Sequence, residues 1–366
     1  MKNEIISERQ GIILITLFII GSTFLIGSGG AAKQDAWIAV IIAIFCSIIL
    51  LLMFSRILSL YPRKDLFDIL QIVMGKFAGK IIGLLMIWFA FHLGALVLRN
   101  ISEFTKILIF SDTPVLVPML FLIMLIIWNL KAGIEVLGRW SEFFIWIVMI
   151  ISLFLTVFLI PEININRLKP ILNNGISTLI NGTFSSFCFP FGETVVFTMV
   201  FSNISKIKSY NKVFIIGLLI GGGIIFLATF RNIIVLGSET ISRIYFPTSM
   251  VVSLIHLGPM FQRLEILVVI AFLICVFVKV SICTLAVCNG ISKVFGFNDY
   301  KFIATPVALL MLSFSFMLYK STMEMSFWAF NVYPYYSFIF EVIIPLVIFI
   351  LAEIKSRSSS TTIVTK

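Results

Sequence analysis

The sequence predicts an all-α polytopic membrane protein with ten transmembrane helices. Hydrophobic residues make up 60% of the chain and charged residues 12%, whereas soluble domains average about 45–50% apolar and about 25% charged residues. The mean hydropathy is +1.13. Uncharged stretches of about 20 residues, the length that crosses the hydrocarbon core as a helix, recur from end to end. So few charged groups could not cover the surface of a soluble domain of this size.

The apolar stretches place the helices in order along the chain. We expect them at residues 11–31, 36–58, 79–105, 112–130, 138–160, 178–202, 211–237, 257–288, 302–319 and 333–353. The third and eighth exceed a perpendicular crossing, which predicts tilt or extension past the headgroups. Residues 1–366 are expected to form a single transmembrane domain, with one five-helix repeat at about 9–160 and a second at about 170–353. The Ser/Thr-rich cytoplasmic tail, 354–366, is expected to be disordered.

The distribution of basic residues predicts the orientation. With the N-terminus inside, 17 of the 27 Lys and Arg residues fall in cytoplasmic segments, seven in outer segments, and Arg99, Arg231 and Lys279 within spans. An excess of Lys and Arg marks the cytoplasmic side, so both termini are expected there. The net charge of +10 then reflects loops that face anionic lipid, with no nucleic acid. In the most basic loop, residues 56–80, a short surface helix is expected after Pro62.

No residue pattern in the sequence is typical of an enzyme, a metal site or a cofactor site. The chain has two histidines and lacks a catalytic triad, a P-loop and a dinucleotide motif. The five cysteines lie within or at the ends of apolar stretches and lack CxxC spacing. We expect them to pack as small apolar residues. The sequence therefore predicts no catalytic residue, no cofactor and no metal.

Two predicted spans contain residues that interrupt a helix. The first carries Gly-Ser-Thr at 21–23, where glycine freedom and hydroxyl groups can support an opened backbone. The sixth carries Pro190, which lacks an N–H group, followed by Gly192 and Glu193. Interruptions at matching places in two five-helix halves point to a transporter's central binding site. The alternative is a pair of kinks with helix-packing glycines, which are common in membranes.

Opened helix ends offer backbone groups to a ligand. Freed N–H groups can hold a carboxylate, and freed carbonyls can hold an ammonium group or a cation. This combination suits a zwitterionic amino acid.

Three motifs resemble those of a known family. Gln34-Asp35-Ala36-Trp37 follows the first span, FPFGE at 189–193 lies in the sixth, and Arg263-Leu264-Glu265 opens the eighth. Together they resemble the endospore germination permeases, the B subunits of nutrient germinant receptors, which are related to the amino acid–polyamine–organocation (APC) transporters. The resemblance covers essentially the whole chain and implies a LeuT-like fold of five-plus-five inverted repeats. It also implies an A-type membrane subunit and a C-type lipoprotein as partners, in the inner membrane of the bacterial spore.

The implied fold places a small-molecule pocket beside the broken first and sixth spans, facing the third and eighth. The family motifs support the choices in spans one and six, and helix geometry alone supports those in spans three and eight. The expected ligand-binding residues are Gly21, Ser22, Thr23, His92, Leu96, Cys188, Phe191, Gly192, Glu193, Ser281 and Thr284.

Four ionisable residues within the spans are candidates for ion or proton coupling, because such groups are costly in a membrane. Glu193, beside the break, is either ionised with a partner or protonated. Lys279 either occupies a cation-like position against opened carbonyls or is a structural, ion-paired lysine. Arg99 and Glu103 share a face of the third span. They either line an outer aqueous vestibule or form an ion pair near the headgroups.

Three functions remain open on the sequence. The first is a receptor subunit that binds a small germinant, such as an amino acid, and triggers spore germination through a larger assembly. The second is a proton- or cation-coupled amino acid transporter that works by alternating access. The third is an interaction scaffold without a working pocket. The first two predict that Gly21→Leu or Gly192→Leu abolishes the response while the protein level is retained.

Overall fold

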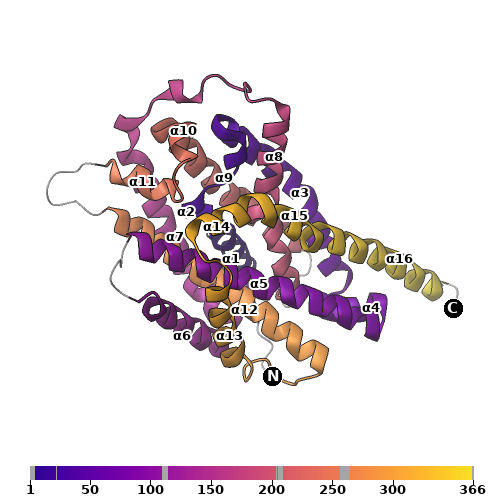
Figure 1. Cartoon of the computed structure of the whole chain (residues 1–366). Coiled ribbons are helices and arrows are strands. Elements are labelled where there is room, and N and C mark those ends of the chain that lie inside the picture. Colours follow the sequence, from indigo (N-terminus) through magenta and orange to yellow (C-terminus); the bar gives the residue numbers. More distant parts are fainter. Residues whose placement is uncertain are drawn as a thin grey trace.

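The computed structural model describes residues 5–21, 23–108, 114–202, 204, 209–255 and 264–364, and these are largely helical (Figure 1). The first half contains α1 (Glu8–Ile20), α2 (Thr23–Ile26), η1 (Gly30–Asp35), α3 (Ala36–Leu60), α4 (Leu66–Met74), α5 (Lys76–Leu108), α6 (Leu116–Ala132), α7 (Ile134–Phe158), η2 (Ile160–Glu162) and η3 (Ile165–Leu168). The second half contains α8 (Ile176–Ser186), η4 (Phe187–Phe191), η5 (Gly192–Met199), α9 (Tyr210–Leu236), α10 (Ser238–Ile241), α11 (Pro247–Ser253), α12 (Glu265–Phe295), α13 (Ala304–Met317), α14 (Thr322–Phe327), η7 (Trp328–Val332), α15 (Tyr333–Phe338), η8 (Ile339–Ile343) and α16 (Ile344–Val364).

Long apolar helices confirm the predicted membrane class. Among the described residues, six helical stretches are long and apolar enough to cross a membrane, and two shorter apolar helices accompany them. The six are Gly30–Leu60, Lys76–Lys106, Ile134–Phe158, Tyr210–Leu236, Glu265–Phe295 and Thr322–Arg357, and the shorter two are Leu116–Ala132 and Ala304–Met317. The stretches predicted as spans one and six are interrupted helices. The count of ten spans stays a prediction.

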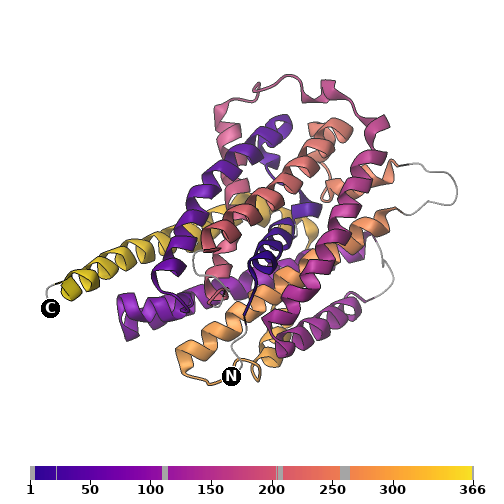
Figure 2. The same cartoon turned by 180° about the vertical axis from the view of Figure 1, so that it is seen from behind.

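Helix α1 lies inside the bundle, surrounded by other helices in both views (Figures 1 and 2). Every residue from Ile13 to Ile20 is buried, as expected for a helix that is apolar all round. Its closest neighbour is α9, where small residues permit the approach. A Cβ atom at Gly217 would lie 2.7 Å from Cβ of Ile15. Glycine at such positions lets two membrane helices pack backbone to backbone.

Helices α5 and α12 are the two predicted long spans, with 33 and 31 residues. They pack along each other through the middle of the molecule. The predicted end of the eighth span at residue 288 is seven residues too early, because α12 continues to Phe295. Gly296 then ends it in the left-handed conformation, with φ of 80°, which glycine adopts without steric cost.

A short amphipathic helix follows Pro62, as predicted. Helix α4 begins after Asp65, whose carboxylate accepts a hydrogen bond of 2.9 Å from the backbone N–H of Asp68. This is an ordinary N-cap interaction. Lys293 of α12 donates to both carboxylate oxygens of Asp68 at 2.8 Å. The two contacts tie the loop after α3 to the end of α12.

The Gln34-Asp35-Ala36-Trp37 motif fastens the connection between the two halves. The side-chain amide of Gln34 donates to the carbonyl of Pro170 at 3.0 Å, and the carboxylate of Asp35 accepts from the backbone N–H of Leu172 at 3.0 Å. Gln34 and Asp35 are both buried. The motif therefore holds the segment before α8 against the start of α3.

Helix α16 continues to Val364, past the start of the tail for which the sequence predicts disorder. Residues 365–366 lie outside the described residues. Helix α16 extends away from the rest of the bundle in both views (Figures 1 and 2).

Candidate ligand site at the helix breaks

The first break separates α1 from α2 at Gly21. Helix α1 ends at Ile20, and Gly21 has φ of 24° and ψ of −130°, outside the helical region. A helix end leaves its last carbonyl groups without intrahelical partners. The hydroxyl group of Thr23, which opens α2, is buried and has no hydrogen-bond partner among the described residues. Ser22, also predicted to bind the ligand, lies outside the described residues.

The second break lies between α8 and η5. Helix α8 ends at Ser186, a turn of π-helix covers Phe187–Phe191, and Phe189 inside it has an extended backbone with φ of −117° and ψ of 107°. Pro190 follows, so the N–H group that a continuous helix would need is missing. The chain then continues as the 3-10 helix η5. Both spans that the sequence predicts to be broken are broken in the structure.

Lys279 of α12 lies where the two breaks meet. Its side chain is 0% exposed and forms an ion pair with Glu193, in the first turn of η5. The ammonium group lies 4.9 Å from the ring centroid of Phe18 in α1 and 5.4 Å from that of Phe189 in η4. A Cβ atom at Gly21 would lie 2.7 Å from Cδ of Lys279. The lysine thus contacts both interrupted segments, and we call this region the break junction.

Each carboxylate oxygen of Glu193 has a partner at the break junction. One carboxylate oxygen pairs with Lys279, and the other accepts a hydrogen bond of 2.6 Å from the hydroxyl group of Tyr333 in α15. Of the two states open on the sequence, this geometry favours an ionised Glu193 with a cationic partner, because charge-assisted hydrogen bonds stabilise a buried carboxylate. Roles of Glu193 and Lys279 in ion or proton coupling stay predictions.

Glu341 is a junction residue that the predicted site does not include. It lies in η8, is 0% exposed, and packs against Gly192. A Cβ atom at position 192 would lie 2.7 Å from Cδ of Glu341. Gly192 therefore makes room for an acidic side chain. The sequence signal was an acidic residue within a span, but nothing in the sequence indicates that positions 192 and 341 meet.

A small cavity borders the junction. Its volume is about 30 Å³, and its lining includes Leu96 and Glu193, together with Asn100, Trp328 and Tyr333. Since one water needs roughly 10–15 Å³ of such volume, it holds about two waters. An amino acid would enter only after the surrounding side chains move.

Other predicted site residues face elsewhere in this conformation. His92 stacks on Trp88 with centroids 5.6 Å apart. Phe191 points toward α9, with a ring atom 3.5 Å from the Cβ position at Gly222. Thr284 donates to the carbonyl of Val280 at 2.7 Å.

Cys188 and Ser281 are buried, and the hydroxyl group of Ser281 has no partner among the described residues. Neither residue lines the small cavity, nor do His92, Phe191 or Thr284. Their part in ligand binding stays a prediction.

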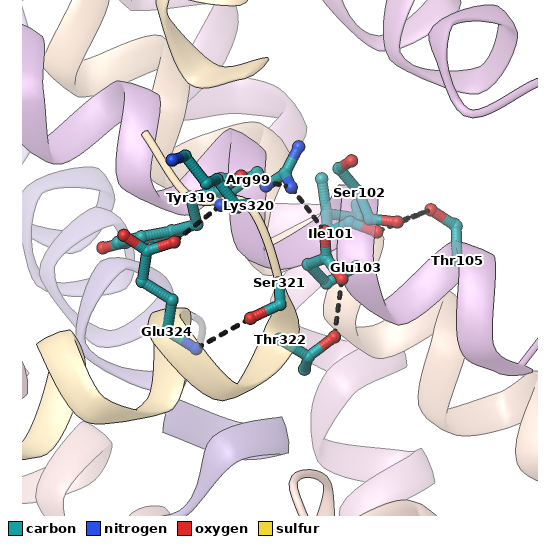
Figure 3. Close-up of polar contacts among 10 residues, drawn as sticks. All are labelled: Arg99, Ile101, Ser102, Glu103, Thr105, Tyr319, Lys320, Ser321, Thr322 and Glu324. Carbon is teal, nitrogen blue, oxygen red and sulfur yellow. Dashed lines mark hydrogen bonds and ion pairs between the residues drawn. The ribbon is translucent and has the colours of Figure 1, made fainter. Parts of the chain in front are cut away.

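Arg99 and Glu103 fasten α5 to the connection between α13 and α14 (Figure 3). Arg99 Nη2 lies 2.8 Å from Glu103 Oε1 and donates to the carbonyl of Tyr319 at 2.8 Å. The hydroxyl group of Thr322 donates to the other oxygen of Glu103 at 2.7 Å. The two side chains are 12% and 8% exposed, so this is a largely buried ion pair. A role in ion coupling stays a prediction.

A second, larger cavity of about 930 Å³ lies at the end of the molecule where Ile6 is found. Its lining is mixed, and its polar side chains include Asp65, Glu135, Asn289 and Lys301. The space at this end is wide enough for many waters.

Comparisons with known proteins identify relatives over nearly the whole chain. A family model described as "Spore germination protein" matches residues 5–325. The chain is 30% identical to Spore germination protein KB of Bacillus subtilis (strain 168), over 98% of this chain and 97% of that protein. It is 25% identical to Spore germination protein A2 of the same organism, over 89% of this chain and 88% of that protein.

One solved structure shares the fold. Mhp1, a nucleobase-cation-symport-1 family transporter in a closed conformation with bromovinylhydantoin bound, aligns with a TM-score of 0.69 and 11% identity, covering 90% of this chain and 75% of Mhp1. At this identity the likeness concerns the fold alone, and it confirms the predicted LeuT-like fold.

Proposed function

Because the chain belongs to the spore germination protein family, we propose that it is the membrane subunit of a nutrient germinant receptor whose break junction binds a small germinant, most simply an amino acid. The family and the transporter fold support a receptor- or permease-like membrane protein without enzymatic activity. The observation that carries the finer proposal is the buried pair of Lys279 and Glu193 between two opened helices.

A zwitterionic ligand carries both charges, so its carboxylate can pair with Lys279 in place of Glu193, and its ammonium group can pair with Glu193 in place of Lys279. Breaking a buried ion pair by removing one partner costs about 3–5 kcal/mol, because the remaining charge is left unpaired. The carboxylate of an amino acid could accept from Lys279 and from freed N–H groups, while its ammonium group binds Glu193. Both buried charges would then stay paired as the junction rearranges. A ligand that carries only one charge would leave one of them unpaired.

The test is binding of radiolabelled L-amino acids to the purified full-length chain in liposomes. We expect Glu193→Gln and Lys279→Gln to weaken binding at least tenfold. Glu353→Gln, which alters a partly exposed acid paired with Arg56, is the control and should bind as the wild type does. Equal binding by all four proteins would remove the junction pair from recognition. If no amino acid binds and spores that carry the junction variants germinate normally, the scaffold function is the correct one.

A coupled amino acid transporter is the second candidate, supported by the fold shared with Mhp1. The same liposomes separate the two functions, because a transporter concentrates its substrate inside. Concentrative uptake driven by a proton or cation gradient would favour the transporter. Saturable binding without flux would favour the receptor.

We further propose that the chain assembles with an A-type membrane subunit and a C-type lipoprotein in the inner membrane of the spore, with both termini in the cytoplasm. The family membership and the excess of basic residues in one set of loops support this arrangement. Co-purification of an affinity-tagged chain from spores tests it.

A further inference from the structure

Three ionisable side chains meet at the break junction, and their charges do not balance. Lys279, Glu193 and Glu341 are each 0% exposed. One cation therefore faces two acids in a region without bulk water. If both acids were ionised, the junction would hold one unpaired negative charge.

Glu341 is the acid that lacks partners. Both oxygens of Glu193 are occupied by Lys279 and Tyr333. Neither oxygen of Glu341 has a hydrogen-bond partner among the described residues. The titratable groups that face it are Glu193 from η5, Lys279 from α12, Cys188 from η4 and Tyr333 from α15, with the Ser337 hydroxyl nearby.

A buried carboxylate without partners is far more costly than a buried carboxylic acid, since the full desolvation cost falls on the charge. Two kinds of ligand could neutralise Glu341, a metal cation or a proton. A metal ion needs several oxygen ligands and space around it. The part of the chain that the structure describes contains no group of three or more His, Cys, Asp or Glu residues that could hold a metal. Glu341 lines neither of the two cavities described above. A proton needs no such space.

We propose that Glu341 is the proton-binding site of the break junction. It carries one proton while Glu193 stays ionised against Lys279, so the junction as a whole is neutral. When the junction opens and water reaches η8, the O–H bond of Glu341 breaks, the proton passes to water as hydronium, and a carboxylate remains. Opening of the junction and proton release are therefore linked. The π-helical turn that carries Glu341 is a local irregularity of the kind often found at functional sites.

Infrared difference spectroscopy tests this directly. A protonated carboxyl group has a C=O stretching band separate from the bands of carboxylates, and the band shifts in deuterium oxide. We expect the purified chain at pH 8, where Asp65 with its pKa of about 6 is ionised, to show this band and Glu341→Gln to lose it. Glu103→Gln, which alters an acid already paired with Arg99, should keep it. The inference is overturned if the wild type has no such band, or if the band persists in Glu341→Gln.

The pH dependence of stability provides a second measurement that needs no spectral assignment. An acid that is protonated in the folded state and ionised when exposed in the unfolded state makes stability fall as pH rises. We expect the melting temperature of the wild type to fall more steeply between pH 5 and pH 8 than that of Glu341→Gln, since Gln keeps the shape of the protonated acid. Equal slopes would contradict the proposal. Both measurements are made without a germinant, so their outcome is independent of whether the junction binds one.

Discussion

Gly21 is the residue on which the first break depends most directly. Its φ of 24° is a conformation that L side chains rarely adopt, and a Cβ atom there would lie 2.7 Å from both Cδ of Lys279 and the backbone carbonyl oxygen of Phe18. The lysine chain can shift, but the backbone oxygen cannot. Any side chain at this position must therefore deform the end of α1 or displace Lys279.

We predict that Gly21→Ala lowers the free energy of unfolding by about 1–3 kcal/mol, the usual range for forcing a residue into a sparsely populated backbone region. Gly223→Ala in α9 is the matched control, because a Cβ atom there has nothing within 4 Å. It should stabilise the helix by up to about 1 kcal/mol. Thermal unfolding of the two purified variants makes the comparison. Equal melting temperatures would mean that Gly21 is not constrained.

At the level of single residues, the sequence predicted the breaks better than the contacts around them. Glycine and proline act through the backbone, so their effect at 21 and 190 can be inferred from local sequence alone. The meeting of Glu341 with Gly192, and the stacking of His92 on Trp88, depend on how helices rotate against one another. No local pattern determines that rotation, so the predicted site lacked Glu341.

Among the elements, α4 begins after Asp65, an N-cap acid that is buried. Burial, together with repulsion from Asp68, raises the pKa of Asp65 from 3.8 to about 6, although the nearby Lys293 acts in the opposite direction. The folded chain therefore holds this proton more tightly than the unfolded chain does. The resulting stabilisation is complete below about pH 4 and is lost as the pH rises through about 6.

We predict that Asp65→Asn removes this pH dependence while keeping α4 intact, because Asn is as good an N-cap residue as Asp. Melting temperatures of the wild type should fall between about pH 4 and pH 6, and those of Asp65→Asn should fall less. Glu162→Gln, at an exposed position, is the control and should follow the wild type. A slope in Asp65→Asn as steep as that of the wild type would refute the assignment.

Element boundaries followed the sequence where residue chemistry marks them. Ser7 caps α1 reciprocally with Gln10, and Asp65 caps α4, both typical start signals, although the first span was expected to begin only at residue 11. The end of α12 was predicted too early because the apolar stretch ends at Cys288, whereas the helix continues to Phe295 and stops at Gly296. Hydropathy follows the lipid boundary, whereas a helix can continue beyond it.

For the whole molecule, the two cavities differ in size and in the residues that line them. The cavity of about 930 Å³ opens beside Ile6, and the cavity of about 30 Å³ beside the junction holds about two waters. If the N-terminus is cytoplasmic, the larger cavity opens to the cytoplasm. This conformation would then admit solutes from the inside and keep the junction closed.

We predict that Asn289→Cys, in a chain whose five cysteines are replaced by serine or alanine, reacts with a membrane-impermeant thiol reagent from the cytoplasmic side. Leu96→Cys in the same background should stay unlabelled from either side, because the reagent is larger than the cavity it would have to enter. Right-side-out and inverted vesicles separate the two directions. Labelling of Asn289→Cys from the outside would reverse the proposed orientation.

The overall architecture was the most predictable level. Membrane depth fixes the length of an apolar helix, and two interruptions at matching places indicate the repeat. The apolar stretches are long and the interruptions occur as a pair. An error of a few residues in a predicted helix boundary therefore changes neither signal. The size of the cavities is different, because it depends on side-chain packing throughout the bundle and leaves no mark in hydropathy.

The contact of Gly192 with Glu341 ties together two positions that are 149 residues apart in the chain. Neither can change freely during evolution. A relative that acquires a methyl group at the first position must shorten or lose the acid at the second, and a relative that loses the acid no longer requires glycine. Substitutions at the two places should therefore occur in pairs, and lineages that exchange both at once would be expected to differ in their response to acidity.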